Sequence, residues 1–177
     1  MRDDDALDNN PYVSKTALEA LHGQLFGWAL SRCGYDHATA EDLMQQAYVE
    51  LLSGRARFDD KSTLKTFVFG VVQNLARSRF RRQSTRLRLI DSYAAEQITV
   101  SEDDHDHGNL KVVWEAVESL PQRQRDITEL VFIRDMTIEE ASVVMGIGLG
   151  SGRVHYDRAK KSLAEKLASL HPKEPSQ

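Results

Sequence analysis

Apolar residues recur at helical spacing in two long blocks of this chain. In residues 16–33, and again in residues 39–52, they fall on one helical face, and Gly54 follows as a stop signal. A wider apolar stripe begins at Leu64, and this helix is expected to run on into a cluster of arginines. The pattern predicts three packed helices in roughly the first 90 residues. No segment shows the alternation typical of a strand.

A second helical block begins at Leu110. Pro121 ends its first segment and can also occupy the first turn of the next helix. Thr137 and Glu140 have the spacing of a capping box, which places a helix start there. Gly146 is suited to the left-handed residue that ends this helix. The block therefore contains several short helices joined by tight turns.

The glycine-rich segment from Gly146 to Gly152, GIGLGSG, leads into the last helix. The dinucleotide fingerprint G-x-G-x-x-G fails here because no glycine stands at the sixth position, and a helix precedes the segment where a strand is needed. The turn of a DNA-reading helix-turn-helix and an ordinary helical hairpin with a solvated basic face both remain open. We expect Gly146 to Gly150 to form the turn and Ser151 to be the N-cap of the last helix. Its inner face is expected to carry Val154, Leu163 and Leu167.

Gly152 falls inside the predicted last helix, where glycine costs roughly 1 kcal/mol relative to better helix formers. A loosened start to the helix is the expected consequence. On this reasoning, Gly152→Val should stabilise the second helical block.

Composition and charge narrow the class of protein. The chain has 177 residues, 41% hydrophobic and 28% charged, with a net charge of −4. Cys33 is its only cysteine, and no apolar run approaches the roughly 20 residues that cross a membrane. The N-terminus is acidic and lacks the apolar core of a secretory signal. These features predict a cytoplasmic protein without membrane insertion.

The charges are segregated along the chain. No acidic residue lies between Arg77 and Ile90, and this basic stretch carries Arg77, Arg79, Arg81, Arg82, Arg86 and Arg88. A local basic stretch can neutralise several phosphates whatever the net charge, although an exposed charged helix end is the simpler alternative. Phe80, Leu87 and Leu89 within it predict that this stretch is partly packed and is not a free tail. Residues 91–109 are acidic and lack periodicity, which predicts a linker.

Catalytic and metal chemistry find little support in the sequence. His105 and His107 stand among aspartates, but a solvated linker explains them better than a metal site does. Cys33 is best explained as a small core residue. No nucleophile and base are selected by their spacing. We therefore expect no enzyme activity, no metal and no cofactor.

Four segments together resemble one known family. AEDLMQQAYVELL and TFVFGVVQNLARSRFRRQ are similar to region 2 of the extracytoplasmic-function (ECF, group 4) RNA polymerase sigma factors of the sigma-70 superfamily. SLPQRQRDITELVFIRDMTIEEASVVMGI and RVHYDRAKKSL are similar to region 4, with its helix-turn-helix and recognition helix. Each motif alone is weak, but their order and spacing over about residues 15–168 make the resemblance specific.

The resemblance implies an all-α fold of two small helical domains joined by a flexible acidic linker. Region 2 would span residues 15–90 and region 4 residues 110–170, with a linker over 91–109. The acidic N-terminus over 1–14 and the tail over 171–177 would lie outside both.

The family's functional residues carry over by position. Promoter DNA and core RNA polymerase, through its β′ clamp and β flap, are the implied partners. The residues expected to face the clamp are Glu41, Asp42, Gln45, Gln46 and Glu50. The residues expected at the minus-10 element are Phe58, Asp59, Lys61, Ser62, Asn74, Arg77 and Arg81. The residues expected at the minus-35 element are Ser151, Arg153, Val154, His155, Asp157 and Arg158.

Departures from the family pattern suggest how activity is controlled. Thr39 and Gln46 replace acidic residues on the clamp-facing helix, which predicts weaker binding to a basic clamp. Phosphorylation of Ser62 or Thr63 by a Ser/Thr protein kinase would add negative charge at a helix N-terminus. Capping of the helix by these hydroxyls is the alternative. An anti-sigma factor is a second candidate controlling partner.

Two other functions compete with the sigma-factor interpretation. A helix-turn-helix regulator that never enters polymerase would need no region 2. A sigma-like interaction protein that does not read DNA would account for the lost acidic residues and for Gly152.

Overall fold

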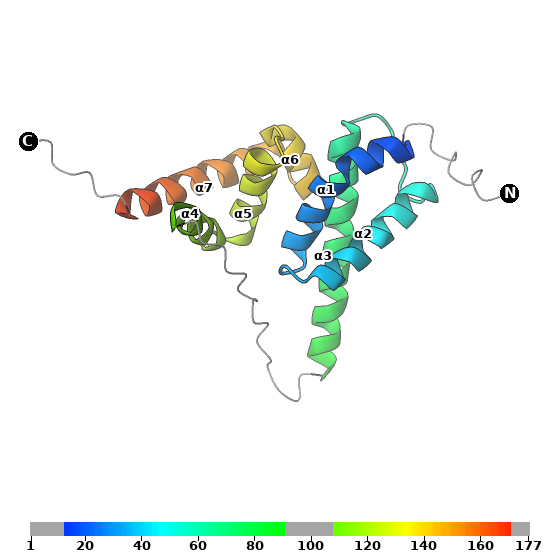
Figure 1. The fold of residues 1–177 in the computed structure, drawn as a ribbon, viewed down its shortest axis with the longest axis horizontal. Helices are drawn as coiled ribbons and strands as arrows, with labels where there is room; N and C mark the ends of the chain where they lie inside the picture. The colour runs from blue at the N-terminus through cyan, green and yellow to red at the C-terminus, as the bar shows by residue number, and fades with distance from the viewer. Residues whose placement is uncertain (1–12, 91–107, 171–177) are drawn as a thin grey trace, which may run out of the picture. The chain divides into compact units, whose positions relative to one another are not determined.

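The computed structural model describes residues 13–90 and 108–170 (Figure 1). The chain divides into two compact units, Met1–Ser101 and Glu102–Gln177. Across the two described ranges every regular element is a helix, so the predicted all-α, two-domain fold is confirmed. The expected N-terminal segment up to residue 12, most of the linker and the tail lie outside the described residues.

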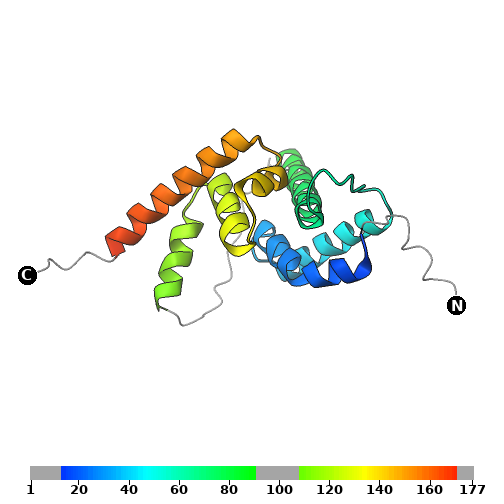
Figure 2. The same cartoon turned by 90° about the horizontal axis from the view of Figure 1, so that it is seen from above.

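The first unit is a pack of three helices, α1 (Lys15–Arg32), α2 (His37–Leu52) and α3 (Leu64–Ile90). Each helix contacts the other two, and Figure 2 shows α3 almost end-on beside α1 and α2. The predicted apolar faces meet in the core, and α3 continues into the arginines as expected. The fully buried side chains include Leu25, Trp28, Leu43, Leu51, Val68, Phe69 and Val72.

Side-chain caps define where the helices of this unit begin. Asp36 accepts a hydrogen bond from the backbone N–H of Thr39 at 2.7 Å, and bonding to Thr39 lowers the pKa of that carboxyl. Thr63 Oγ1 accepts from the N–H of Thr66 at 3.2 Å and so caps α3. Gly54, with a φ of 69°, follows the end of α2 as predicted.

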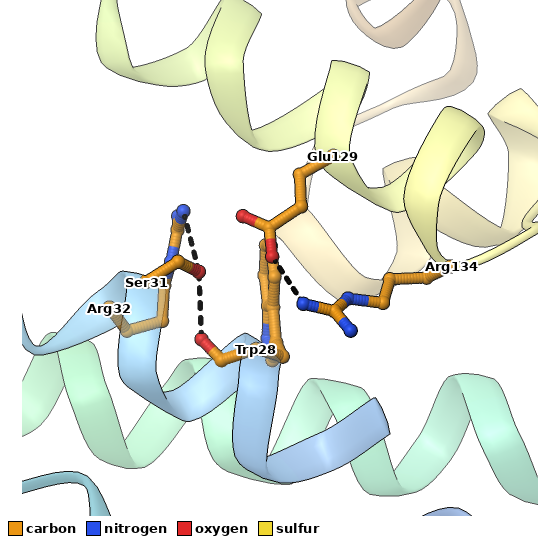
Figure 3. Close-up of polar contacts among 5 residues, drawn as sticks. All are labelled: Trp28, Ser31, Arg32, Glu129 and Arg134. Carbon is orange, nitrogen blue, oxygen red and sulfur yellow. Dashed lines mark hydrogen bonds and ion pairs between the residues drawn. The ribbon is translucent and has the colours of Figure 1, made fainter. Parts of the chain in front are cut away.

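Trp28 anchors α1 against α3. Its ring lies 6.2 Å from that of Phe69, centroid to centroid, and the guanidinium of Arg32 lies over it at 4.1 Å. Ser31 Oγ donates to the Trp28 carbonyl at 2.9 Å, one turn back along the helix (Figure 3). The end of α1 is thereby tied to the core, which positions the turn that leads into α2.

The second unit is built on its longest helix, α7 (Leu149–Leu170), which contacts each of the other three α-helices of this unit. These are α4 (Gly108–Glu118), α5 (Gln122–Thr128) and α6 (Ile138–Met145). The first of them begins at Gly108, whereas the expected linker extended to residue 109. Pro121 is the N-cap of α5. The buried apolar side chains include Leu120, Ile127, Leu130, Val144, Met145 and Ala159.

A π-helical segment, η2 (Glu129–Ile133), continues directly from α5 and was not predicted. The N–H of Arg134 donates to the Glu129 carbonyl at 3.1 Å, which is the wide turn of a π-helix. The same two residues form an ion pair, with Arg134 Nη2 2.8 Å from Glu129 Oε1 (Figure 3). Both side chains are nearly buried, so this ion pair stabilises the widened turn.

The connection from α6 to α7 confirms two sequence predictions. Thr137 and Glu140 form both hydrogen bonds of the capping box, at 3.1 and 2.9 Å. Gly146 ends α6 in the left-handed conformation, with a φ of 61°. Each feature depends only on residues close in sequence, which explains why the pattern predicted them.

Three expectations about α7 are wrong. Ser151 is not its N-cap, because the helix begins at Leu149 and the Gly148 carbonyl accepts the bond from the Gly152 N–H at 3.0 Å. The turn therefore ends at Gly148 and does not extend to Gly150. Val154 does not lie on the inner face, since 45% of it is exposed. The inner face carries Gly152 and Ala159 in its place.

Gly152 packs directly against α6. A Cβ atom at this position would lie 2.0 Å from Ser142 Oγ and 3.2 Å from Ser142 Cβ. No space is left empty by the missing side chain, because Ser142 and Ile127 fill it. The expectation that Gly152→Val stabilises the unit is therefore wrong, since the added atoms would collide with α6.

Candidate nucleic-acid interface

The outer face of α2 carries most of the residues expected at the clamp. Its helical period buries Leu43, Met44, Ala47 and Leu51 and leaves a polar face exposed. The exposed members of the expected set are Glu41, Asp42, Gln45 and Gln46.

Glu50 and Asp42 are engaged within the first unit. Glu50 is only partly exposed, and its Oε2 lies 3.2 Å from Arg55 Nε. Asp42 Oδ2 lies 3.9 Å from Arg79 Nη2 on α3. The Asp42–Arg79 pair is exposed and the Glu50–Arg55 pair is partly exposed, so both are weak and a partner's cations can compete for either carboxylate.

Val49 was missed by the sequence reasoning. It is 53% exposed and lies one turn beyond Gln45 and Gln46 on the same face of α2. Helical spacing alone could have found it. An apolar residue in the middle of a polar face makes this surface suited to a protein partner.

The loop between α2 and α3 is held by an aromatic contact. Phe58 is half-buried, and its ring lies 5.2 Å from that of Phe67, centroid to centroid. Asp59 and Lys61 are exposed and joined by an ion pair of 2.5 Å. Hydrogen bonding to Lys61 lowers the pKa of Asp59, and the same bond raises the pKa of Lys61. The side chains of Asp59 and Lys61 are thus exposed to solvent, while the contact between Phe58 and Phe67 holds the loop against α3.

Asn74, Arg77 and Arg81 lie on one exposed face of α3. They are spaced by three and four residues, which aligns them along the helix. Cys33, at the end of α1, lies near Arg79 in the same region. Burial raises the pKa of the Cys33 thiol, and the nearby Arg79 partly opposes this effect. The guanidinium groups of Arg77 and Arg81 make this face of α3 cationic, and a cationic surface is what binding to a phosphate backbone requires.

The N-terminal half of α7 presents a second exposed face. Of the six residues expected at the minus-35 element, His155 is half-buried and the other five are exposed: Ser151, Arg153, Val154, Asp157 and Arg158. Val154, Asp157 and Arg158 fall on the side of α7 opposite Gly152 and Ala159, and Ser151 and Arg153 flank that side. His155 lies three residues from Gly152 and four from Ala159, at the edge of the inner face. A helix held by its inner face with polar residues free on its outer face can enter a groove of DNA.

Exposed apolar residues also gather near η2. Phe132 is 60% exposed and Ile133 is 48% exposed, and the ring of Phe132 stacks on that of Tyr156 at 5.8 Å. The π-helical turn changes the helical period, so a regular apolar stripe could not predict which of these residues point outward. Lys160 lies over the other aromatic ring, 5.5 Å from the centroid of Tyr156.

The described residues contain no group of three His, Cys, Asp or Glu side chains that could hold a metal ion. His105 and His107 lie outside the described residues. Within the described ranges, no helix has the length and apolar character needed to cross a membrane.

Comparison with known proteins matches both units to one family. Residues 17–86 match Sigma-70 region 2, and residues 110–163 match Sigma-70, region 4. The RNA polymerase sigma factor CarQ of Myxococcus xanthus is 26% identical over 158 residues, covering 86% of this chain and 88% of CarQ. The ECF RNA polymerase sigma factor EcfG of Rhodopseudomonas palustris is 26% identical over 128 residues, covering 72% of this chain and 71% of EcfG.

Two solved structures share the fold. The sigma factor RpoE from Bartonella quintana, in complex with the anti-sigma factor NepR, is 24% identical with a TM-score of 0.70, over 86% of this chain and 95% of RpoE. CnrH, in complex with the cytosolic domain of CnrY, is 22% identical with a TM-score of 0.60, over 93% of each chain.

Proposed function

Since this chain belongs to the ECF group of the sigma-70 family, we propose that it is an alternative sigma factor that binds core RNA polymerase and directs promoter-specific initiation. The observation that carries the proposal is the order of its exposed faces. A polar face on α2 and a basic face on α3 belong to the region 2 match, and a polar reading face on α7 belongs to the region 4 match. Polymerase supplies the chemistry, and this chain supplies positioning.

The polymerase contact is assigned to α2. Glu41, Asp42, Gln45 and Gln46 would face the β′ clamp together, with Glu50 at the edge of the surface. Gln45 and Gln46 can hydrogen-bond to a partner but carry no charge, so the surface depends less on attraction to basic residues. The β flap is the partner proposed for the second unit.

The DNA contacts are divided between the two units. The minus-10 element would meet the loop residues Phe58, Asp59, Lys61 and Ser62 together with Asn74, Arg77 and Arg81 on α3. A flipped base costs a few kcal/mol of stacking and pairing, so a loop that captures one must supply contacts of its own. The minus-35 element would meet α7 through Ser151, Arg153, Val154, His155, Asp157 and Arg158. Arginine at the start of a helix in the major groove typically pairs with guanine.

Control by a second protein is the regulation that the relatives favour. RpoE and CnrH were each solved with a protein bound to them, and for RpoE that protein is an anti-sigma factor. We propose an anti-sigma factor as the partner of this chain. Phosphorylation near Thr63 stays a separate prediction, and it faces a physical obstacle. The Thr63 hydroxyl already caps α3 through Thr66, so a phosphate there must replace that bond.

The Thr63 prediction can be tested by polymerase binding. Thr63→Ala, Thr63→Glu and kinase-treated protein are compared for their affinity for core polymerase. A switch requires the phosphorylated and glutamate forms to bind more tightly than the alanine form. Equal affinity of all three would leave Thr63 as a helix cap only.

The decisive experiment for the proposed function is in vitro transcription with core polymerase and a promoter library. We expect start sites that depend on the added protein. Arg153→Ala should change the base preference at the minus-35 element, because the arginine lies on the exposed reading face. Lys161→Ala is the matched control, since it removes an exposed cation about 12 Å further along the same helix.

The two competing functions predict different results. Binding to core polymerase without any dependent start site would favour a sigma-like interaction protein. Sequence-specific DNA binding in the absence of polymerase, with no transcription, would favour an independent helix-turn-helix regulator. Unchanged minus-35 preference in Arg153→Ala would remove that residue from the reading face.

A further inference from the structure

Val154 lies at the centre of the outer face of α7. It is about half a turn around the helix from Gly152, which packs against α6, and 45% of it is exposed. Valine at such a position gains little burial within its own chain, and it is a weaker helix former than alanine or the charged residues common on helix surfaces. Its side chain is therefore suited to a contact outside the chain.

The turn that precedes Val154 leaves its methyl groups uncovered. Side chains of a helix lean toward its N-terminus, so Val154 leans over Gly150 and Ser151, one turn back. Both residues are exposed, and a Cβ atom at Gly150 would meet no atom within 4 Å. A β-branched side chain in a helix keeps essentially one rotamer. The two methyl groups of Val154 are thus accessible and held in one direction, with little rotamer freedom to lose on binding.

The charges around Val154 select the kind of partner. Arg153 is the preceding residue, Asp157 and Arg158 lie one turn further on, and all three are exposed. The arginines favour an anion. The Asp157 carboxylate is instead repelled by phosphate and requires a hydrogen-bond donor, such as the amino group that cytosine presents in the major groove. This combination fits base edges framed by phosphates better than it fits a phosphate backbone alone.

The apolar surface at Val154 is only one side chain wide, because its neighbours on the helix are polar or lack a side chain. Among the four bases of DNA, only thymine presents an apolar group to the major groove, its C5-methyl. We propose that Val154 contacts the C5-methyl group of one thymine in the minus-35 element and thereby selects an A·T pair at that position. This inference rests on the proposed function, since it names the base read by one residue of the proposed minus-35 surface.

Deoxyuridine tests the contact directly, because it pairs as thymine does and lacks only the methyl group. In a promoter identified by the transcription experiment, each minus-35 thymine on either strand is replaced singly, and the affinity of the holoenzyme is measured. Replacement at one position should weaken binding by the parent about fourfold, the factor expected for burial of one methyl group. In Val154→Ala the same replacement should change the affinity less than about twofold. Val154→Ile should keep the sensitivity of the parent, because isoleucine retains a β-branched apolar side chain.

Val143→Ala is the matched control. Val143 is 54% exposed but lies on α6, and the first helix of a helix-turn-helix crosses the DNA backbone without reading base edges. Its replacement should leave the deoxyuridine effect at about fourfold. The thermal midpoint should change little in either alanine variant, because both valines are about half exposed.

Several results would overturn the inference. A minus-35 element without an A·T pair would exclude it outright. The absence of any deoxyuridine effect, in a parent that directs transcription, would refute only this inference. An effect of equal size in Val154→Ala would assign the methyl group to another residue. Weaker binding of Val154→Ala to core polymerase without DNA would identify a protein surface as the partner. A parent that directs no transcription would refute the proposed function as well.

Discussion

A methyl group added at Gly152 tests how closely α7 packs against Ser142 of α6. The Cβ atom of an alanine would lie 2.0 Å from Ser142 Oγ, 3.2 Å from Ser142 Cβ and 3.5 Å from Ile127 Cδ1. Rotation of the Ser142 side chain relieves only the first overlap, because its Cβ does not move in that rotation. The two helices must therefore separate by some tenths of an ångström or distort.

Three free-energy changes set the size of the effect. Alanine is favoured over glycine inside a helix by about 1 kcal/mol. Rotation of Ser142 gives up the bond from its hydroxyl to the Ile138 carbonyl, which is 2.6 Å long, and such a bond contributes about 1 kcal/mol. Overpacking of a filled interior costs about 1–3 kcal/mol. We expect Gly152→Ala to lower the free energy of unfolding of the second unit by about 1–3 kcal/mol, and Gly152→Val to lower it further.

Gly150→Ala is the matched control for this substitution. Gly150 lies in the same helix and is exposed, and nothing lies within 4 Å of the position its Cβ would take. Its replacement should therefore stabilise the unit by about 0.5–1 kcal/mol. Urea unfolding of the full chain measures both effects, and hydrogen exchange in α6 and α7 assigns them to the second unit. The two alanine variants should shift stability in opposite directions.

A double-mutant cycle attributes the cost to one contact. Ser142→Gly removes both atoms that the new methyl group would meet most closely. In that background Gly152→Ala should recover most of its helix-propensity gain, which gives a coupling free energy above about 1 kcal/mol. The reasoning is refuted if Gly152→Ala stabilises the unit as much as Gly150→Ala does. An equal cost with and without the Ser142 side chain would also refute it.

Three further predictions follow from local contacts. The pKa of Asp36 is lowered by its bonds to Thr39, so the stabilisation is present above the ordinary pKa of about 4 and is lost as the pH falls through the lowered value. Urea midpoints at about pH 5 and about pH 3 should therefore fall more in the parent than in Asp36→Asn, and equal falls would contradict this. The raised pKa of Cys33 should shift its iodoacetamide alkylation profile to higher pH than that of free cysteine, and Arg79→Ala should shift it further. Thr137→Ala should lower the free energy of unfolding by about 1 kcal/mol, whereas Thr137→Ser should change it little. Equal stability of the parent and Thr137→Ala would show that the capping box does not stabilise the unit.

Most of the helical architecture could be predicted from the sequence because its signals are local. The apolar face of α2, the capping box at Thr137 and the left-handed Gly146 each depend on residues within about two helical turns. The exposed face of α7 that is proposed to read DNA followed from the helix-turn-helix interpretation and not from periodicity. Periodicity alone had assigned Val154 to the core.

The errors arise where a contact joins residues distant in sequence or where the helical period changes. The sequence showed Gly152 as a gap, whereas the fold fills that position with Ser142 from the preceding helix. The widened turn of η2 has no simple sequence signature, so the exposure of Phe132 was not foreseen. The expectation that Phe80 is partly packed is wrong, since it is 70% exposed. Its exposure depends on where α1 and α2 end relative to α3, which no residue of α3 encodes.

The arginines of α3 repel one another along the helix. Arg77 and Arg81 are one turn apart, and like charges at this spacing disfavour the helical form by about 0.2–0.5 kcal/mol per pair. Phosphates that bind these arginines remove the repulsion. Occupancy by a polyanion and helix formation in this part of the chain are therefore thermodynamically linked. Added salt should screen the repulsion and weaken phosphate binding at once, so circular dichroism and DNA affinity should respond to ionic strength in opposite directions.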